Sequence, residues 1–191
     1  MNADPGLSSE QTATERYSRA MRTLHWVRAA LLLGLVGLGW YMTSLPDAAP
    51  VKFDTLYPTH KEFGVLAFII VCIALVVRRR SRVPELPKGL ARWEAMLAHA
   101  THRAMYVLAV VVPLIGYARS STFTQSDGVP FFFFMIPEVL PKNDNVSEVL
   151  SQLHEYLAFT LLGLAVLHIL GALKHRFLHR RRETDVLSRM L

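Results

Sequence analysis

Apolar residues in this chain are gathered into four long blocks, and the stretches between them carry most of the charge and proline. The blocks cover about residues 24–44, 59–77, 97–117 and 152–173. Each has roughly the 20 residues with which an α-helix crosses the hydrocarbon core of a bilayer. Apolar residues fill each block rather than one face of it, as is typical of membrane helices. The pattern therefore predicts an all-α, integral membrane four-helix bundle.

The third connector, residues 118–148, is the longest. It contains the apolar run Phe131–Ile136, which is too short to span a bilayer. We interpret this run as an interfacial segment on the outer membrane surface, where aromatic residues are favoured, or alternatively as a cap over the outer end of the bundle. Pro113 is expected to kink the third helix. Asp144 or Ser147 is expected to be the N-cap of the fourth helix.

Basic residues orient the four spans. All but four of the 21 Lys and Arg residues lie in or beside the N-terminal segment, the second connector and the C-terminal segment. The exceptions are Lys52, Lys61, Arg119 and Lys142. The positive-inside rule then places both termini in the cytoplasm. Topology and contact with anionic membrane lipid account for the net charge of +6, so no nucleic acid is expected as a partner.

The two ends of the chain are polar. Residues 1–15 have neither a basic start nor a short apolar core, so we expect a disordered tail and no cleavable signal peptide. Residues 180–191 are interpreted as a basic cytoplasmic tail, which leaves residues 16–179 as one membrane domain. Cys72 stands alone in an apolar block and is interpreted as a small core residue, so a thiolate-bound metal cluster is not expected.

Histidine is the polar residue that stands out in the spans. His168 interrupts the fourth apolar block, and a histidine inside a membrane span marks a candidate functional site. His154 lies fourteen residues earlier, which is close to four helical turns. The two rings therefore share one side of the helix, about 21 Å apart along its axis. Two haems that share one helix require this arrangement, each with a partner histidine at its own depth.

Depth in the membrane sorts the other histidines. The full set is His25, His60, His99, His102, His154, His168, His175 and His179. At the outer ends of their spans, His60 matches His154. Towards the cytoplasm, His168 matches either His25 or one of the two histidines of the third span.

Other polar and small residues have simpler interpretations. His179, and His102 with it, is interpreted as an interfacial side chain that snorkels or hydrogen-bonds near the headgroups. A zinc or copper site is disfavoured because His154 and His168 are too far apart to share one ion. Glycines in the spans allow a flat ring, or simply another helix, to approach closely. These glycines are Gly34, Gly37, Gly39, Gly64, Gly116, Gly163 and Gly171.

The order of these residues resembles that of the bacterial cytochrome b561 proteins, within a wider group of di-haem four-helix membrane cytochromes that includes the cytochrome b subunits of nickel–iron hydrogenases. The resemblance covers about residues 16–177. The matching residues are Tyr17, Ser18, Arg19, Leu24, His25, Trp26, His60, His99, Ala100, Thr101, His102, His154, Glu155, His168 and His175.

The resemblance implies a bacterial inner-membrane protein with two haem b groups per chain. His25 and His168 would ligate the iron of the cytoplasmic-side haem. His60 and His154 would ligate the iron of the periplasmic-side haem. Ubiquinone is expected near the cytoplasmic-side haem, where His175 is the candidate for contact with a quinone carbonyl; the alternative is a tail histidine at the lipid headgroups.

The resemblance also implies electron transport between the periplasmic face and the quinone pool, as a superoxide:ubiquinone oxidoreductase. Superoxide or another periplasmic donor would approach an outer mouth at which Lys61 and Arg119 are the available cations. A second possibility is a membrane-anchor cytochrome b subunit of a periplasmic dehydrogenase or hydrogenase, with Phe131–Phe134 as the docking surface. A third is a haem-free scaffold or transporter, which would lack a b-type visible spectrum.

Overall fold

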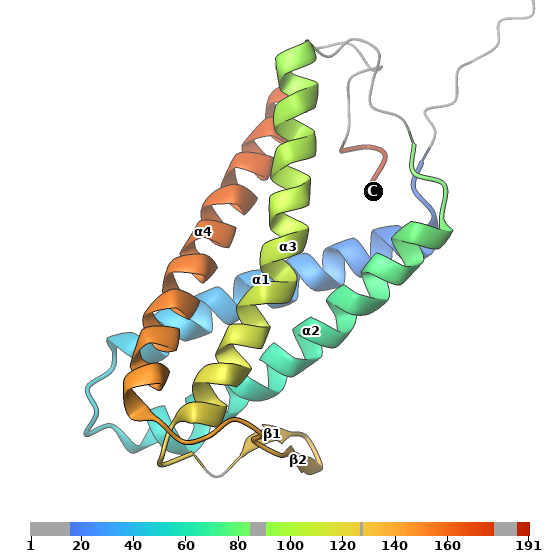
Figure 1. The fold of residues 1–191 in the computed structure, drawn as a ribbon. Helices are drawn as coiled ribbons and strands as arrows, with labels where there is room; N and C mark the ends of the chain where they lie inside the picture. The colour runs from blue at the N-terminus through green and yellow to red at the C-terminus, as the bar shows by residue number, and fades with distance from the viewer. Residues whose placement is uncertain (1–15, 85–90, 127, 178–186) are drawn as a thin grey trace, which may run out of the picture.

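The computed structural model describes residues 16–84, 91–126, 128–177 and 187–191. Its body is formed by four long helices (Figure 1). These are α1 Arg19–Ser44, α2 Tyr57–Arg80, α3 Arg92–Thr122 and α4 Asp144–Phe177. Each is long and apolar enough to cross a membrane, so the predicted four spans are confirmed. The expectations for residues 1–15, and for the basic tail as far as residue 186, lie outside the described residues.

Polar residues extend the helices beyond the apolar blocks. At the start of α1, the Met21 backbone N–H donates to the side chain of Ser18 at 3.3 Å and so satisfies one of the free N–H groups of the first turn. A five-residue π-helix, η1 Lys52–Leu56, leads into α2. Lys52 is only 6% exposed and forms an ion pair with Asp47 at 2.6 Å. This ion pair holds the start of η1 against the residues that directly follow α1.

The start of α4 corrects one expectation. Asn143 is the N-cap, because its side chain accepts from the Val146 backbone N–H at 3.2 Å. Asp144 instead accepts from the backbone N–H of Thr124 at 2.8 Å. The buried Ser147 hydroxyl donates to a backbone carbonyl of α3 at 3.1 Å. Both residues expected at the cap therefore join α4 to the preceding part of the chain.

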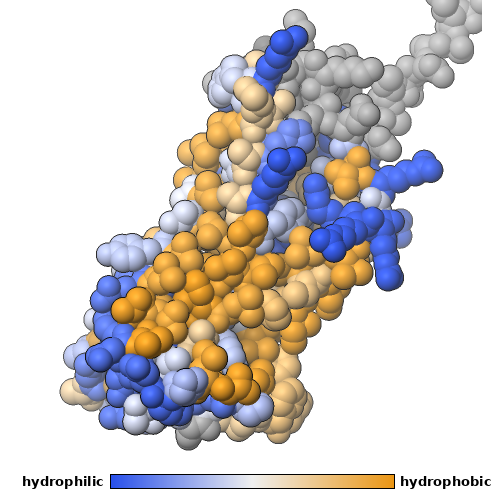
Figure 2. Space-filling view, viewed as in Figure 1, coloured by the Kyte–Doolittle hydropathy of each residue, from blue (hydrophilic) through white to orange (hydrophobic). Residues whose placement is uncertain are grey.

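The helices pack through small residues. α3 and α4 run side by side, and α1 packs mainly on α2 (Figure 1). The most buried side chains in the middle of the bundle are Ala67, Val71, Ala74, Ala109 and Leu161. Large apolar side chains point outwards along all four helices. Figure 2 shows them covering the middle of the visible face, with hydrophilic residues gathered towards the ends. An apolar surface of this extent requires lipid around it.

The third connector contains a β-hairpin that the sequence did not predict, so the all-α description needs this addition. Its strands are β1 Val129–Phe131 and β2 Phe134–Ile136, paired antiparallel. β1 packs against α2, as expected if the connector caps the outer end of the bundle. At the tip, however, Phe133 is 100% exposed. The connector is therefore a cap with a protruding aromatic tip.

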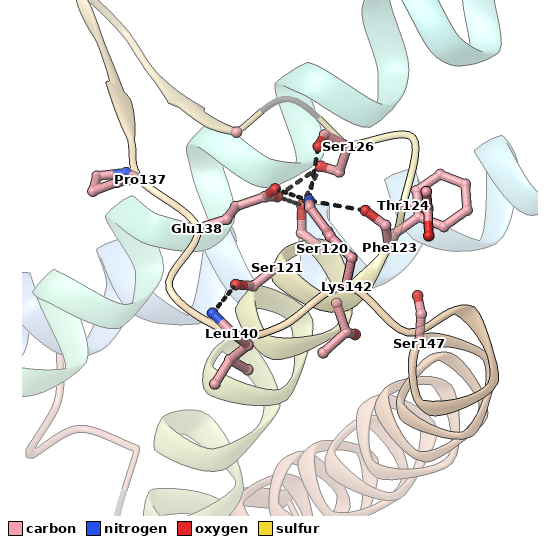
Figure 3. Close-up of polar contacts among 12 residues, drawn as sticks. Ser120, Ser121, Phe123, Thr124, Ser126, Pro137, Glu138, Leu140, Lys142 and Ser147 are labelled. Atoms are coloured by element: carbon pink, nitrogen blue, oxygen red, sulfur yellow. Dashed lines mark hydrogen bonds and ion pairs between the residues drawn. The ribbon is translucent and has the colours of Figure 1, made fainter.

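Glu138 holds the hairpin to the end of α3 (Figure 3). Its carboxylate accepts from Lys142 at 2.5 Å, from Ser126 at 2.7 Å and from Ser120 at 2.9 Å. The side chain of Glu138 is only 6% exposed. Burial alone would raise the pKa of Glu138, but the hydrogen bonds from Lys142, Ser126 and Ser120 outweigh burial and hold its pKa below the usual value. The carboxylate is thus an ionised, buried anchor for the outer cap.

The C-terminal segment Leu187–Leu191 lies against the start of α1. The Tyr17 backbone N–H donates to the Arg189 carbonyl at 3.2 Å. The Trp26 indole N–H donates to the Met190 carbonyl at 2.9 Å. The two ends of the described chain therefore meet at one end of the bundle, the end opposite the hairpin.

Candidate functional site

Four histidines form two facing pairs at different depths of the bundle. α4 carries one member of each pair. His168 faces His25 of α1, and their ring centres are 6.2 Å apart at an interplanar angle of 66°. His154 faces His60 of α2, also with ring centres 6.2 Å apart, at an angle of 79°. The structure thus brings together the residues that depth and the family resemblance had paired.

The spacing of both pairs fits a metal ion between the rings. A histidine–metal bond is about 2.0 Å long and the ring centre lies roughly 1.1 Å beyond the nitrogen, so an ion midway between opposed rings separates their centres by about 6.2 Å. Each pair has this separation. Within the described part of the chain, no three His, Cys, Asp or Glu side chains converge as a metal site would require. The pairs therefore suit an ion whose other ligands come from a cofactor, as in a haem.

The outer pair is oriented by α3 and closely packed by glycine. His154 Nδ1 lies 3.0 Å from the Val112 carbonyl oxygen, which can only accept, so the neutral ring carries its proton on Nδ1 and leaves Nε2 free as a ligand. A Cβ on Gly116 would lie 3.0 Å from the His154 ring, and one on Gly39 would lie 3.3 Å from the His60 ring. Both helices approach these rings closely because the two positions have no side chain.

A third histidine, His102 of α3, contacts the inner pair, although the sequence had suggested an interfacial position for it. His102 Nε2 lies 3.2 Å from His168 Nδ1, and the two ring centres are 5.0 Å apart. The interfacial interpretation of His102 is thus incomplete, because its ring orients His168. His99 forms no ring contact or hydrogen bond with His168 in the described residues. The other interfacial candidate, His179, lies outside them.

The cations expected at the outer mouth behave differently from each other. Arg119 acts electrostatically on both His60 and His154. Its guanidinium carbon lies 5.5 Å from the centre of the Tyr57 ring, and its buried Nε has no hydrogen-bond partner among the residues described. Lys61 instead donates to a serine hydroxyl and a glycine carbonyl of the third connector. Arg119 is therefore the cation that acts on both outer rings, while Lys61 is engaged by the third connector.

His175 lies in the last turn of α4, half-buried and about 10 Å along the helix axis from His168. The neighbouring Lys174 donates to Glu94 of α3 at 2.8 Å. Glu94 also experiences the charge of His175. His175 is thus at the same end of the bundle as the inner pair, beside a charged contact between α3 and α4.

The sequence profile of a family described as "Prokaryotic cytochrome b561" matches residues 16–191. The chain belongs to the prokaryotic cytochrome b561 family. It is therefore a haem-containing membrane protein of electron transport. The family resemblance stated from the histidine and tryptophan pattern is confirmed.

Curated relatives of this cytochrome share most of its length. It is 31% identical to "Cytochrome b561 homolog 2" of Escherichia coli (strain K12), over 93% of this chain and 92% of that protein. It is 24% identical to "Probable superoxide oxidase CybB" of Yersinia pestis, over 85% of this chain and 90% of that protein. The expectation of a membrane cytochrome of this family is thus confirmed, and one of these relatives is named a probable superoxide oxidase.

Proposed function

We propose that this cytochrome binds two haem b groups and carries electrons from superoxide at its outer end to ubiquinone at its inner end. His60 and His154 would hold the iron of the outer haem. His25 and His168 would hold the iron of the inner haem. The observation that carries the proposal is the occurrence of two histidine pairs with ring centres 6.2 Å apart, both built on α4.

Hydrogen bonds support the choice of ligands at both ends. The backbone bond of His154 and the contact between His102 and His168 each engage Nδ1, so Nε2 of both rings would be free to hold the haem iron. The contact of His102 Nε2 with the His168 ring supports His25 rather than His102 as the inner ligand. His102 is therefore a positioning residue for His168 in this proposal.

The contribution of the protein is positioning and insulation. When bound, each haem supplies a reversible one-electron carrier. α4 is a rigid element that fixes both sites about 21 Å apart along its axis. Apolar side chains and the surrounding lipid would keep water and dissolved oxidants away from the interior between the two ends.

The residues at the two ends suit the two substrates. Two superoxide anions would leave as O₂ after giving up one electron each, while one ubiquinone gains two electrons and two protons to become ubiquinol. Arg119 would attract the superoxide anion to the outer pair. His175 would deliver a proton to a quinone carbonyl oxygen at the inner end. The distribution of basic residues supports the cytoplasm for this end, with both chain termini.

Single histidine substitutions test the ligand assignment. His25→Ala and His168→Ala should each remove the inner haem and spare the outer one; His60→Ala and His154→Ala should do the reverse. Haem per chain is measured by the pyridine haemochrome spectrum, and the remaining site by its low-spin electron paramagnetic resonance signal. His99→Ala is the control and should retain both haems. Loss of haem in this control with retention in His25→Ala would show that the inner pairing is wrong.

Rapid mixing tests the reaction itself. Superoxide should reduce the purified holoprotein, and subsequent addition of ubiquinone should reoxidise it. His175→Ala should slow only the second step, whereas Arg119→Gln should slow only the first. A protein with both haems that is not reduced by superoxide would contradict the proposed donor.

A membrane-anchor subunit is the second candidate, and the exposed hairpin tip favours it. Phe132, Phe133 and Phe134 are each at least 50% exposed. A periplasmic dehydrogenase or hydrogenase could dock there and supply the electrons. Cross-linking from position 133 in native membranes should capture such an enzyme if this is the function, and only lipid if the hairpin is a membrane contact.

A further inference from the structure

Two partly buried arginines lie beside His25 of the inner histidine pair, Arg28 on α1 and Arg78 in the last turn of α2. The guanidinium carbon of Arg28 is 4.7 Å from the centre of the Tyr106 ring, and that of Arg78 is 5.3 Å from it. Both arginines and His25 line one cavity of about 30 Å³, at which Met190 of the C-terminal segment also lies. Residues from α1, α2, α3 and the chain end thus place two positive charges at one small space next to a proposed haem ligand.

These two charges have no carboxylate partner in the structure. Neither Arg28 nor Arg78 forms an ion pair with any residue that the structure describes. The aromatic face of Tyr106 stabilises a cation in part, but it also brings two like charges together. Two cations held this close together are stabilised by an anion between them. The arrangement therefore calls for an anion that the described chain does not supply.

Building on the proposed haem sites, we infer that Arg28 and Arg78 together bind a propionate carboxylate of the inner haem. The guanidinium group matches a carboxylate with two parallel, charge-assisted hydrogen bonds. The cavity has room for about one or two water-sized groups, which suits a carboxylate arm but not a quinone ring. The haem would then be fixed both at its iron and at its edge.

The reduction potential of the inner haem reports this contact. Removing a nearby positive charge favours the oxidised iron, which carries one more positive charge than the reduced iron. Arg28→Gln and Arg78→Gln should therefore each lower the inner midpoint potential, with at least about a tenfold change in the oxidation equilibrium, or 59 mV for a one-electron couple. The matched control is Arg79→Gln, which removes an exposed charge from the same turn of α2. The outer potential should not change in any variant.

A haem without free carboxylates separates this proposal from its rivals. In protein loaded with haem dimethyl ester, Arg28→Gln and Arg78→Gln should lower the inner potential clearly less than they do with native haem, because no propionate carboxylate is left without its partner. If these arginines bind lipid phosphate instead, the potential shift will be the same with the ester and with native haem, and the inference is overturned. If a Gln variant loses the inner haem, Arg28→Lys and Arg78→Lys keep the charge and should restore binding. Failure of the Lys variants to bind haem would also overturn the inference.

Different results would contradict the carboxylate contact and the proposed function. A chain with two haems and an inner potential that does not respond to either arginine contradicts only the carboxylate contact. A chain that binds no haem, or that keeps both haems after His25→Ala, contradicts the proposed haem sites themselves.

Discussion

Replacing Gly116 by alanine tests whether the outer site depends on the close approach of α3 to a histidine ring. The added Cβ would lie 3.0 Å from His154 Cε1 and 3.2 Å from Nδ1, whereas ordinary contacts are 3.4–4 Å. The ring must therefore move by some tenths of an ångström, but its 3.0 Å bond to the Val112 carbonyl resists this. Overpacking of this kind costs about 1–3 kcal/mol. A ligand set tolerates displacements of only about 0.5 Å.

We therefore expect Gly116→Ala to weaken binding of the outer haem by about tenfold or more, since 1.4 kcal/mol corresponds to a factor of ten. The inner haem should be retained. The control is Gly163→Ala in α4, where an added Cβ would meet no atom within 4 Å. Because alanine favours a helix over glycine by about 0.5–1 kcal/mol, the control should bind both haems and be at least as stable as the original chain.

The assay combines haem per chain, from the pyridine haemochrome spectrum, with the two low-spin resonance signals. Titration with limiting haem separates weaker affinity from failure to fold. If Gly116→Ala binds two haems with unchanged resonance positions and unchanged affinity, the close packing of α3 on the His154 ring does not affect haem binding and the reasoning is wrong.

Three further predictions follow from contacts outside the ligand pairs. His102→Ala should leave the inner haem ligated but lower its affinity about 10–100-fold, because His168 loses the ring that orients it; an unchanged haem titration would contradict this. Since the pKa of Glu138 is held low, its ionisation stabilises the outer cap above the usual glutamate pKa of about 4.3, and this stability is lost as pH falls through the lowered pKa. Thermal unfolding between pH 5 and 3 (roughly one unit either side of the usual pKa) should therefore be less pH-dependent in Glu138→Gln, and equal slopes would refute the assignment. Deleting residues 187–191 should shift the fluorescence of Trp26 and lower stability by about 0.5–1.5 kcal/mol for each hydrogen bond that this segment makes with Tyr17, Arg22 and Trp26, whereas an unchanged spectrum would show that the chain end does not dock there.

The four spans could be predicted because twenty consecutive apolar residues leave few alternatives to a membrane helix. The pairing of His60 with His154 followed from depth alone, since the helical rise fixes how far each ring lies along its span. Depth alone could not decide whether His25 or a histidine of the third span faces His168. His99 and His102 are only three residues apart, and which of them faces α4 depends on the rotation of α3, which tertiary packing sets.

The cap of α4 and the hairpin could not be predicted from the pattern of polar and apolar residues. Asn143, Asp144 and Ser147 are all good capping residues, and only the tertiary contacts of the latter two decide among them. The hairpin has no alternation of polar and apolar residues, and its turn uses Phe132 at φ 52° where glycine or asparagine would give a recognisable signal.

The position of α4 in the chain has a consequence for how the protein is made. Each facing pair takes one ring from this helix, and α4 is the last of the four to be synthesised. A ribosome that stops before α4 therefore releases a membrane protein in which neither pair exists. On the proposed ligand assignment, such a truncated chain would hold neither haem and would remain colourless, whereas a chain that includes α4 would be coloured.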